Sequence, residues 1–171
     1  MEEYILLSIF LFILIIGGLY TWCSYCYNKK PFPIIVKNMF VFYFLQFTCG
    51  IIMNLLGAIG FLFFLCIGKR PQKFGYCIVI PLNGESGLSL GVFIFANTKY
   101  LTMLCHEHGH AFQNCIFGPF MPFVVGLPSV IRYWYREFIY RFGNPHSLVD
   151  YDDIWFEGQA SLSGTTFYEQ K

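Results

Sequence analysis

The chain has 171 residues, of which 56% are hydrophobic, 21% aromatic and only 12% charged. Soluble domains carry about 25% charged residues, so this composition excludes an ordinary soluble domain and indicates an integral membrane protein. The formal net charge is +1, too small for the basic surface that binds nucleic acid. We therefore expect the lipid bilayer as a partner and no nucleic acid.

The first hydrophobic segment predicts a transmembrane helix over residues 4–27. Residues 4–28 carry no charged side chain, and about 20 apolar residues span the hydrocarbon core of a bilayer. A cleaved signal peptide is the alternative. Glu2 and Glu3 argue against it, because they stand where a signal peptide is basic.

A second uncharged segment covers residues 38–68 and completes a membrane part that we place at residues 1–73. As one helix it would be roughly 46 Å long, against a hydrocarbon core of about 30 Å. It must therefore tilt, protrude or break, and the candidate positions for a break are Gly50, Asn54, Gly57 and Gly60. A transporter-like bundle, to which Gln46 and Asn54 would belong, is an alternative that two spans make unattractive.

Residues 74–171 are expected to form a compact α+β catalytic part. Stretches 76–82 and 88–96 are rich in β-branched and aromatic residues, and the turn sequence between them predicts a β-hairpin. Pro81 restricts the first strand to an edge or a strand end. Asn97 and Thr98 have N-cap side chains, so we expect a helix from there to about Phe117, ended by Gly118-Pro119.

This predicted helix contains the sequence His106-Glu107-His108-Gly109-His110. At 3.6 residues per turn, His106 and His110 share one face and can bind one ion. Glu107 lies beside them, where a metalloprotease needs a general base for water polarised by zinc. The alternative is a histidine-rich helix end with hydrogen-bonded imidazoles. We predict that His106 and His110 bind Zn²⁺ and that Glu107 is the catalytic base.

A catalytic zinc site needs a third protein ligand. The downstream candidates are His146, Asp150, Asp152, Asp153 and Glu157. His146 lies in a turn-like sequence, and the aspartates are typical of a helix N-terminus. Glu157 lies among apolar residues, where an unpaired carboxylate would be costly and a bound metal would compensate it.

Residues 132–141 alternate bulky aromatic residues with cations. This composition is typical of a helix at a membrane interface, and a core helix with exposed arginines is the alternative. Lysines and arginines flank both hydrophobic segments, so the orientation in the membrane stays open. Cys105 and Cys115 flank the histidine motif and favour a cytoplasmic catalytic part.

The chain carries five short motifs, which in order are Gly87-Leu88-Ser89-Leu90-Gly91, His106 to His110, Gly118-Pro119, Gly126-Leu127-Pro128-Ser129 and the Trp/Glu/Ala helix at 155–160. His-Glu-x-Gly-His followed downstream by a helical Glu-x-x-Ala resembles the gluzincin metallopeptidases, especially the membrane-embedded CAAX prenyl endopeptidase and the heat-shock membrane protease. The full set of motifs is more closely similar to small bacterial membrane proteins that carry the same motifs.

The resemblance implies a zincin-like fold with a β-hairpin, an active helix and a C-terminal helix that carries Glu157 as the third zinc ligand. It implies a bacterial inner-membrane metalloprotease that cleaves peptides or membrane proteins. Family members often have an aspartate four residues after that glutamate, whereas this chain has Ser161, which can hydrogen-bond an imidazole but carries no charge.

Two further expectations concern how the site is used. Residues 88–96 are the best candidate for an edge strand that binds extended substrate by β-addition. The active helix should lie at the bilayer boundary and face a water-filled cleft, because an ionised group that faces lipid costs a few kcal/mol or more. The alternative function is a non-catalytic membrane protein that keeps the metal-binding fold as a binding or regulatory module; the intact Glu107 argues against it.

Overall fold

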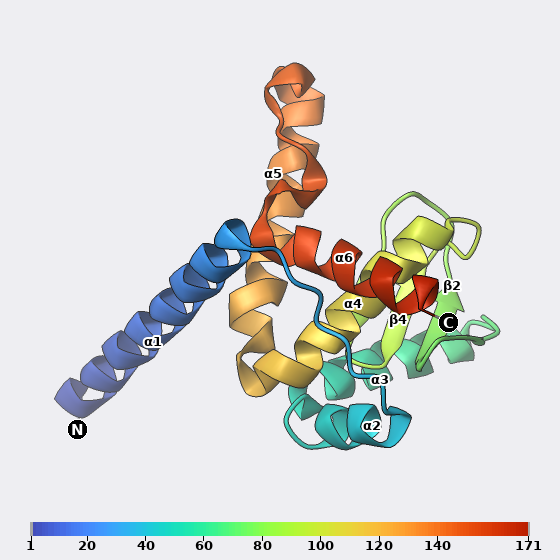
Figure 1. Ribbon diagram of the computed structural model, residues 1–171, viewed down its shortest axis with the longest axis horizontal. Helices are drawn as coiled ribbons and strands as arrows, with labels where there is room; N and C mark the ends of the chain where they lie inside the picture. Colours follow the sequence, from blue (N-terminus) through green and yellow to red (C-terminus); the bar gives the residue numbers. More distant parts are fainter. Residues whose placement is uncertain (1, 171) are drawn as a thin grey trace.

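The computed structural model describes residues 2–170 and shows a mixed α+β fold, mostly helical, with one small sheet (Figure 1). Helix α1 (Glu2–Lys29) projects away from the rest of the chain, and its side chains 4–15 are exposed. Its second half is attached to the body, where Tyr20 packs edge-on against Trp155. Residues Tyr4–Lys29 are long and apolar enough to cross a membrane, so the prediction of a candidate transmembrane helix is confirmed.

The second hydrophobic segment is broken, which is one of the three arrangements that its length allows, and the break includes the predicted position Gly50. Helices α2 (Met39–Phe47) and α3 (Ile51–Cys66) meet at an angle of 90°. A buried hydrogen-bond network holds this corner: Asn54 donates to the Gln46 carbonyl and side-chain oxygens at 2.8 Å each. Gln46 in turn donates to the Ala111 carbonyl (2.7 Å), and Asn114 donates to Gln46 (2.6 Å). These polar side chains tie the corner to the helix of the histidine motif.

The predicted β-hairpin is wrong in its pairing. The strand before the turn sequence, β2 (Cys77–Pro81), pairs in parallel with β4 (Phe93–Ala96), and the true hairpin joins β3 (Leu88–Leu90) to β4. Gly91, with φ of 66°, lets the chain reverse between β3 and β4, because glycine adopts positive φ without steric cost. The strands are β1 (Gln72–Phe74), β2 (Cys77–Pro81), β3 (Leu88–Leu90) and β4 (Phe93–Ala96), in the order β1-β2-β4-β3.

Two details of these strands bear on the predictions. Pro81 is the last residue of β2, as expected for a residue without an N–H group. The predicted edge strand 88–96 is divided: β4 lies inside the sheet, and only β3 lies at an edge. Any β-addition next to the histidine motif therefore has to use β3.

The histidine motif lies on α4 (Leu101–Phe117). The predicted N-cap at Asn97 is wrong, because the Asn97 side chain accepts a hydrogen bond from the Lys99 N–H (3.1 Å) and so closes its own turn before the helix begins. Tyr100 is the N-cap residue. Gly118, with φ of 51°, ends the helix as predicted.

Helices α4 and α6 (Trp155–Glu169) lie side by side (Figure 1). Two glycines make this contact as close as backbones allow. A Cβ atom on Gly109 would collide with the Ala160 carbonyl, and one on Gly164 with the Cys105 carbonyl. The glycine inside the histidine motif therefore brings the backbone of α6 directly against the active helix.

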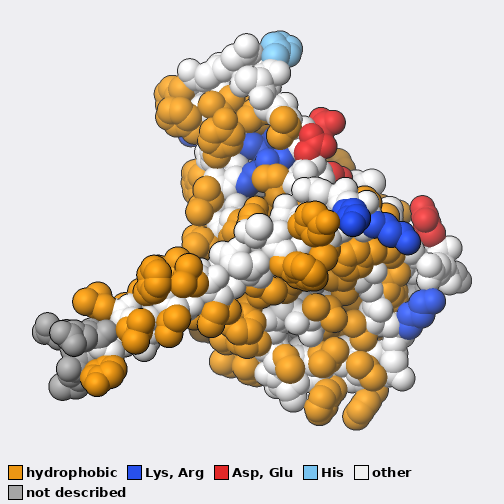
Figure 2. Space-filling view, turned by 60° about the vertical axis from the view of Figure 1, so that its left-hand side comes forward, with side chains coloured by type: hydrophobic (Ala, Val, Ile, Leu, Met, Phe, Trp, Pro, Cys, Tyr) orange, Lys and Arg blue, Asp and Glu red, His pale blue; other side chains and the backbone are white. Residues whose placement is uncertain are grey.

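Between α4 and α6 the chain forms a short 3-10 helix (Gly118–Phe120), a short π-helix (Pro122–Gly126) and helix α5 (Leu127–Phe142). It then returns to α6. Helix α5 projects from the body (Figure 1), and none of its residues is buried. The alternative of a core helix is therefore wrong, and a location at the membrane interface stays a prediction. In Figure 2, hydrophobic side chains cover α1 and the lower body, and charged ones gather in the upper and right-hand parts.

Candidate metal centre

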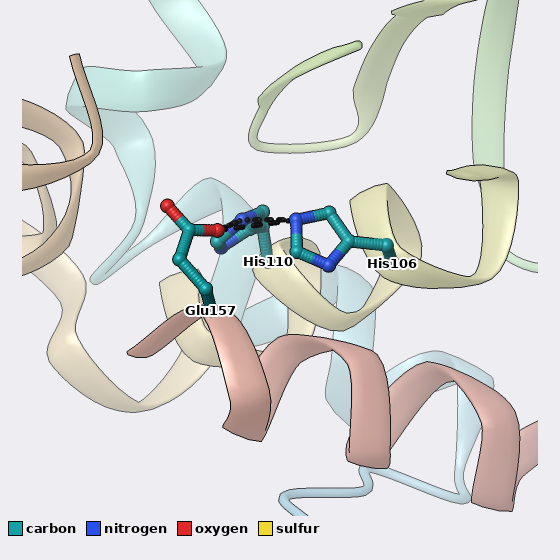
Figure 3. Close-up of side chains that lie close together, drawn as sticks. All are labelled: His106, His110 and Glu157. Carbon is teal, nitrogen blue, oxygen red and sulfur yellow. Dashed lines mark hydrogen bonds and ion pairs between the residues drawn. The ribbon is translucent and has the colours of Figure 1, made fainter. Parts of the chain in front are cut away.

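Three predicted ligand residues converge between α4 and α6 (Figure 3). One carboxylate oxygen of Glu157, Oε2, lies 3.2 Å from Nε2 of His106 and 3.2 Å from Nε2 of His110. The two Nε2 atoms are 3.1 Å apart. Ligand atoms placed tetrahedrally around zinc at 2.0–2.1 Å are about 3.3 Å from one another. The three side chains therefore form a group that could hold one metal ion.

A hydrogen-bond chain orients the His110 ring. Gln113 donates its side-chain N–H to the Phe156 carbonyl (2.7 Å), which turns its oxygen toward Nδ1 of His110 at 2.8 Å. Nδ1 of His110 must therefore carry the proton and donate. The lone pair of a neutral His110 then lies on Nε2, the atom that faces the other two ligands.

A second chain orients His106 in the same way. Nδ1 of His106 lies 2.8 Å from Oγ of Ser161, and the Ser161 hydroxyl donates to the Asp152 carboxylate at 3.0 Å. Because that hydroxyl proton is directed to Asp152, the serine oxygen accepts from His106. Ser161 therefore connects the His106 imidazole to the carboxylate of Asp152.

Glu157 is fully buried and both of its oxygens have partners. Oε2 faces the histidines, and Oε1 accepts a hydrogen bond from Ser129 (2.6 Å). Burial alone would raise the pKa of Glu157, but the hydrogen bonds and charge of His106 and His110 outweigh it and hold the pKa well below its usual range. The carboxyl group is therefore ionised, as a metal ligand must be.

Glu107 lies beside the ligands and lines the two cavities that open at the site. Gly87, just before β3, lies against the Glu107 side chain so closely that a Cβ on Gly87 would collide with it. The two cavities share Gly87, His106, Glu107 and Tyr151. The general base predicted from the sequence therefore stands where both cavities meet.

Tyr151 is the site residue that sequence reasoning did not find. It follows α5 in the return segment 143–154, packs edge-on against His106 with ring centroids 5.8 Å apart, and lies under Arg132 and Arg136 at 5.5 and 5.6 Å. Burial, and then the charge of Glu157, raise the pKa of Tyr151 above its usual range. Its phenol stays protonated and can donate a hydrogen bond.

The remaining third-ligand candidates do not join the group. His146, Asp150 and Asp153 are exposed, and Asp152 contacts Ser161 instead of a ligand position. Among residues 2–170, the group of His106, His110 and Glu157 is the one cluster of three or more such side chains that could share an ion.

Comparisons with family models, with curated proteins and with solved structures found no match to this chain.

Proposed function

We propose that this protein is a membrane-embedded zinc metallopeptidase that hydrolyses peptide bonds. The observation that carries the proposal is the convergence of two Nε2 atoms and one carboxylate oxygen within 3.1–3.2 Å, next to a glutamate outside the ligand set. A purely structural zinc site is closed by protein ligands and has no need of Glu107 at the meeting point of two cavities.

Zinc bound at this site would act as a Lewis acid and lower the pKa of a water molecule. Glu107 would accept the proton of that water and later pass it to the leaving amine. Tyr151 would donate a hydrogen bond to the substrate carbonyl oxygen as negative charge develops there. The unpaired edge of β3 would hold the substrate backbone by β-addition, because Gly87 at its start lies against Glu107.

We also propose where the protein lies in the cell. The candidate transmembrane helix α1 would anchor the protein in a bacterial inner membrane, with the catalytic part on the cytoplasmic side. The support for that side is that all seven cysteines are unpaired, which is typical of a reducing compartment.

Two variants of the zinc-loaded full chain in detergent test the function. Glu107→Gln should keep one zinc per chain and lose peptide hydrolysis by ~10²–10⁴-fold, because an amide cannot accept the proton. His110→Ala should lose zinc. Glu169→Gln is the matched control, since Glu169 is an exposed glutamate at the end of α6 and should change neither property.

Each outcome points to a definite conclusion. Unchanged zinc content in His110→Ala would remove the metal site from the proposal. Equal turnover by wild type and Glu107→Gln would show that Glu107 is not the base. Zinc binding without hydrolysis of any peptide or membrane protein would favour the non-catalytic binding or regulatory module.

A further inference from the structure

The two cavities at the site differ in chemical character. One, here called the polar chamber, has a volume of about 390 Å³ and its walls carry Glu85, Arg136 and Glu137. The other, the apolar chamber, has a volume of about 240 Å³, and apart from His110 and the site residues that it shares with the polar chamber its walls are mostly aliphatic and methionine side chains. These apolar walls include Leu56, Leu88, Leu90, Val125 and Val130.

The two chambers lie on opposite sides of the reacting position along one stretch of backbone. Glu85 and Ser86 line only the polar chamber, Gly87 lines both, and Leu88 to Leu90 line only the apolar chamber. The chain from Glu85 to Leu90 therefore passes from polar surroundings, past Glu107, into apolar surroundings. A substrate strand bound along β3 would therefore have polar surroundings on one side of its scissile bond and apolar surroundings on the other.

The wall of the apolar chamber is continuous with the hydrophobic segment. Leu56 belongs to α3, the second half of the broken membrane segment, and is half-exposed. The polar chamber is bounded instead by Arg136 and Glu137 of α5. An apolar stretch of a substrate can therefore enter beside α3, while polar residues on the other side of the bond stay among charged groups and water.

We infer that the substrate is a peptide segment in which an apolar stretch is followed by a polar one, and that the bond cleaved lies at their junction. This inference rests on the proposed function. Antiparallel addition to β3, the more stable pairing per residue, directs the residues N-terminal to the bond into the apolar chamber. The residues C-terminal to the bond then lie in the polar chamber. The juxtamembrane end of a transmembrane segment has this composition.

Four peptides of equal length, each with a central cleavable bond, test the inference with the zinc-loaded full chain. Their two halves are apolar–polar, polar–apolar, apolar–apolar and polar–polar, and mass spectrometry locates the cut. We expect the apolar–polar peptide to be cleaved at the junction, with kcat/KM at least about tenfold above the other three, a ratio that apolar pocket contacts can supply.

Variants of the apolar chamber show whether its walls cause the preference. Val130→Lys and, independently, Leu88→Lys should reduce the preference severalfold, because a cation replaces an apolar wall. Both side chains are half-exposed, so neither change disturbs the core. Leu127→Lys is the matched control: Leu127 is exposed on the same helix as Val130 and lines neither chamber.

Failure of the inference and failure of the function are distinguishable. Equal cleavage of all four peptides, fastest cleavage of any other peptide, or an unchanged preference in both lysine variants would overturn the inference and leave the peptidase standing. If no peptide is cleaved, the proposed function fails and the inference fails with it.

Discussion

Replacing Ser161 by alanine should weaken zinc binding without unfolding the protein. The Ser161 oxygen accepts a hydrogen bond from Nδ1 of His106 at 2.8 Å, and its hydroxyl donates one to Asp152 at 3.0 Å. Alanine removes both hydrogen bonds and leaves the ring free to turn. Ser161 is only half-buried, so water can replace part of what is lost.

The size of the effect follows from the partners that are removed. Loss of a hydrogen-bond partner behind a ligating histidine typically costs 10–100-fold in metal affinity, about 1.4–2.7 kcal/mol. Because water can enter, we expect about tenfold for Ser161→Ala. Asp152→Asn should cost less, since an amide oxygen still accepts from the serine. The double variant Ser161→Asp/Asp152→Asn restores a carboxylate next to His106 and should recover wild-type affinity.

Competition with a chromophoric chelator, on the full chain in detergent, measures these affinities without any need for activity. Thr165→Ala is the matched control, because the Thr165 hydroxyl bonds only the Ser161 carbonyl one turn back on α6. If Ser161→Ala binds zinc as tightly as wild type, the hydrogen-bond chain does not support the ligand. If the double variant binds zinc as weakly as Ser161→Ala does, the negative charge of Asp152 does not contribute to zinc affinity through the hydrogen bonds of Ser161.

Two further changes test how the fold positions the site. Gly109→Ala should separate α4 from α6, cost about 3 kcal/mol, and abolish metal binding, because its Cβ meets the rigid Ala160 carbonyl. Gly126→Ala is the control, because its Cβ would meet only ordinary contacts, and it should change neither melting temperature nor zinc content. Equal effects of Gly109→Ala and Gly126→Ala would contradict the packing argument.

Asn54→Leu should lower the free energy of unfolding by about 1–3 kcal/mol, since it leaves the buried Val92 N–H unpaired. An unchanged melting temperature in detergent would show that the hydrogen bond from Val92 to Asn54 does not stabilise the fold.

The features predicted correctly depend on short stretches of sequence. The uncharged run of α1, the end of α4 at Gly118 and the shared face of His106 and His110 all follow from composition and from the helical repeat. The pairing of β2 with β4 does not. It depends on a reversal at Gly91 and on the other edge of β2 being already taken by β1, and neither fact is visible in the strand sequences themselves.

The contacts between motifs that are far apart in the chain could not be predicted from the sequence either. The motif residues Gly87 and Ser129 contact Glu107 and Glu157 respectively, although they lie 20 and 28 positions away along the chain. Taken by itself in the sequence, Ser161 offers His106 a hydrogen bond but no charge. Asp152 lies nine positions earlier, so only the three-dimensional arrangement reveals that it provides the charge through the serine.

The arginines of α5 have a structural role that their sequence pattern does not indicate. Their alternation with aromatic residues predicts a membrane-interface helix, yet Arg132 donates to the carbonyls of Asp150 (2.6 Å) and Tyr151 (3.0 Å), and Arg136 donates to that of Val149 (2.6 Å). Both cations also lie over the Tyr151 ring. These contacts hold the return segment 143–154 against α5 and so position Tyr151 at the cavities. Helix α5 therefore contributes to the site itself, whatever surface its outer aromatic residues contact.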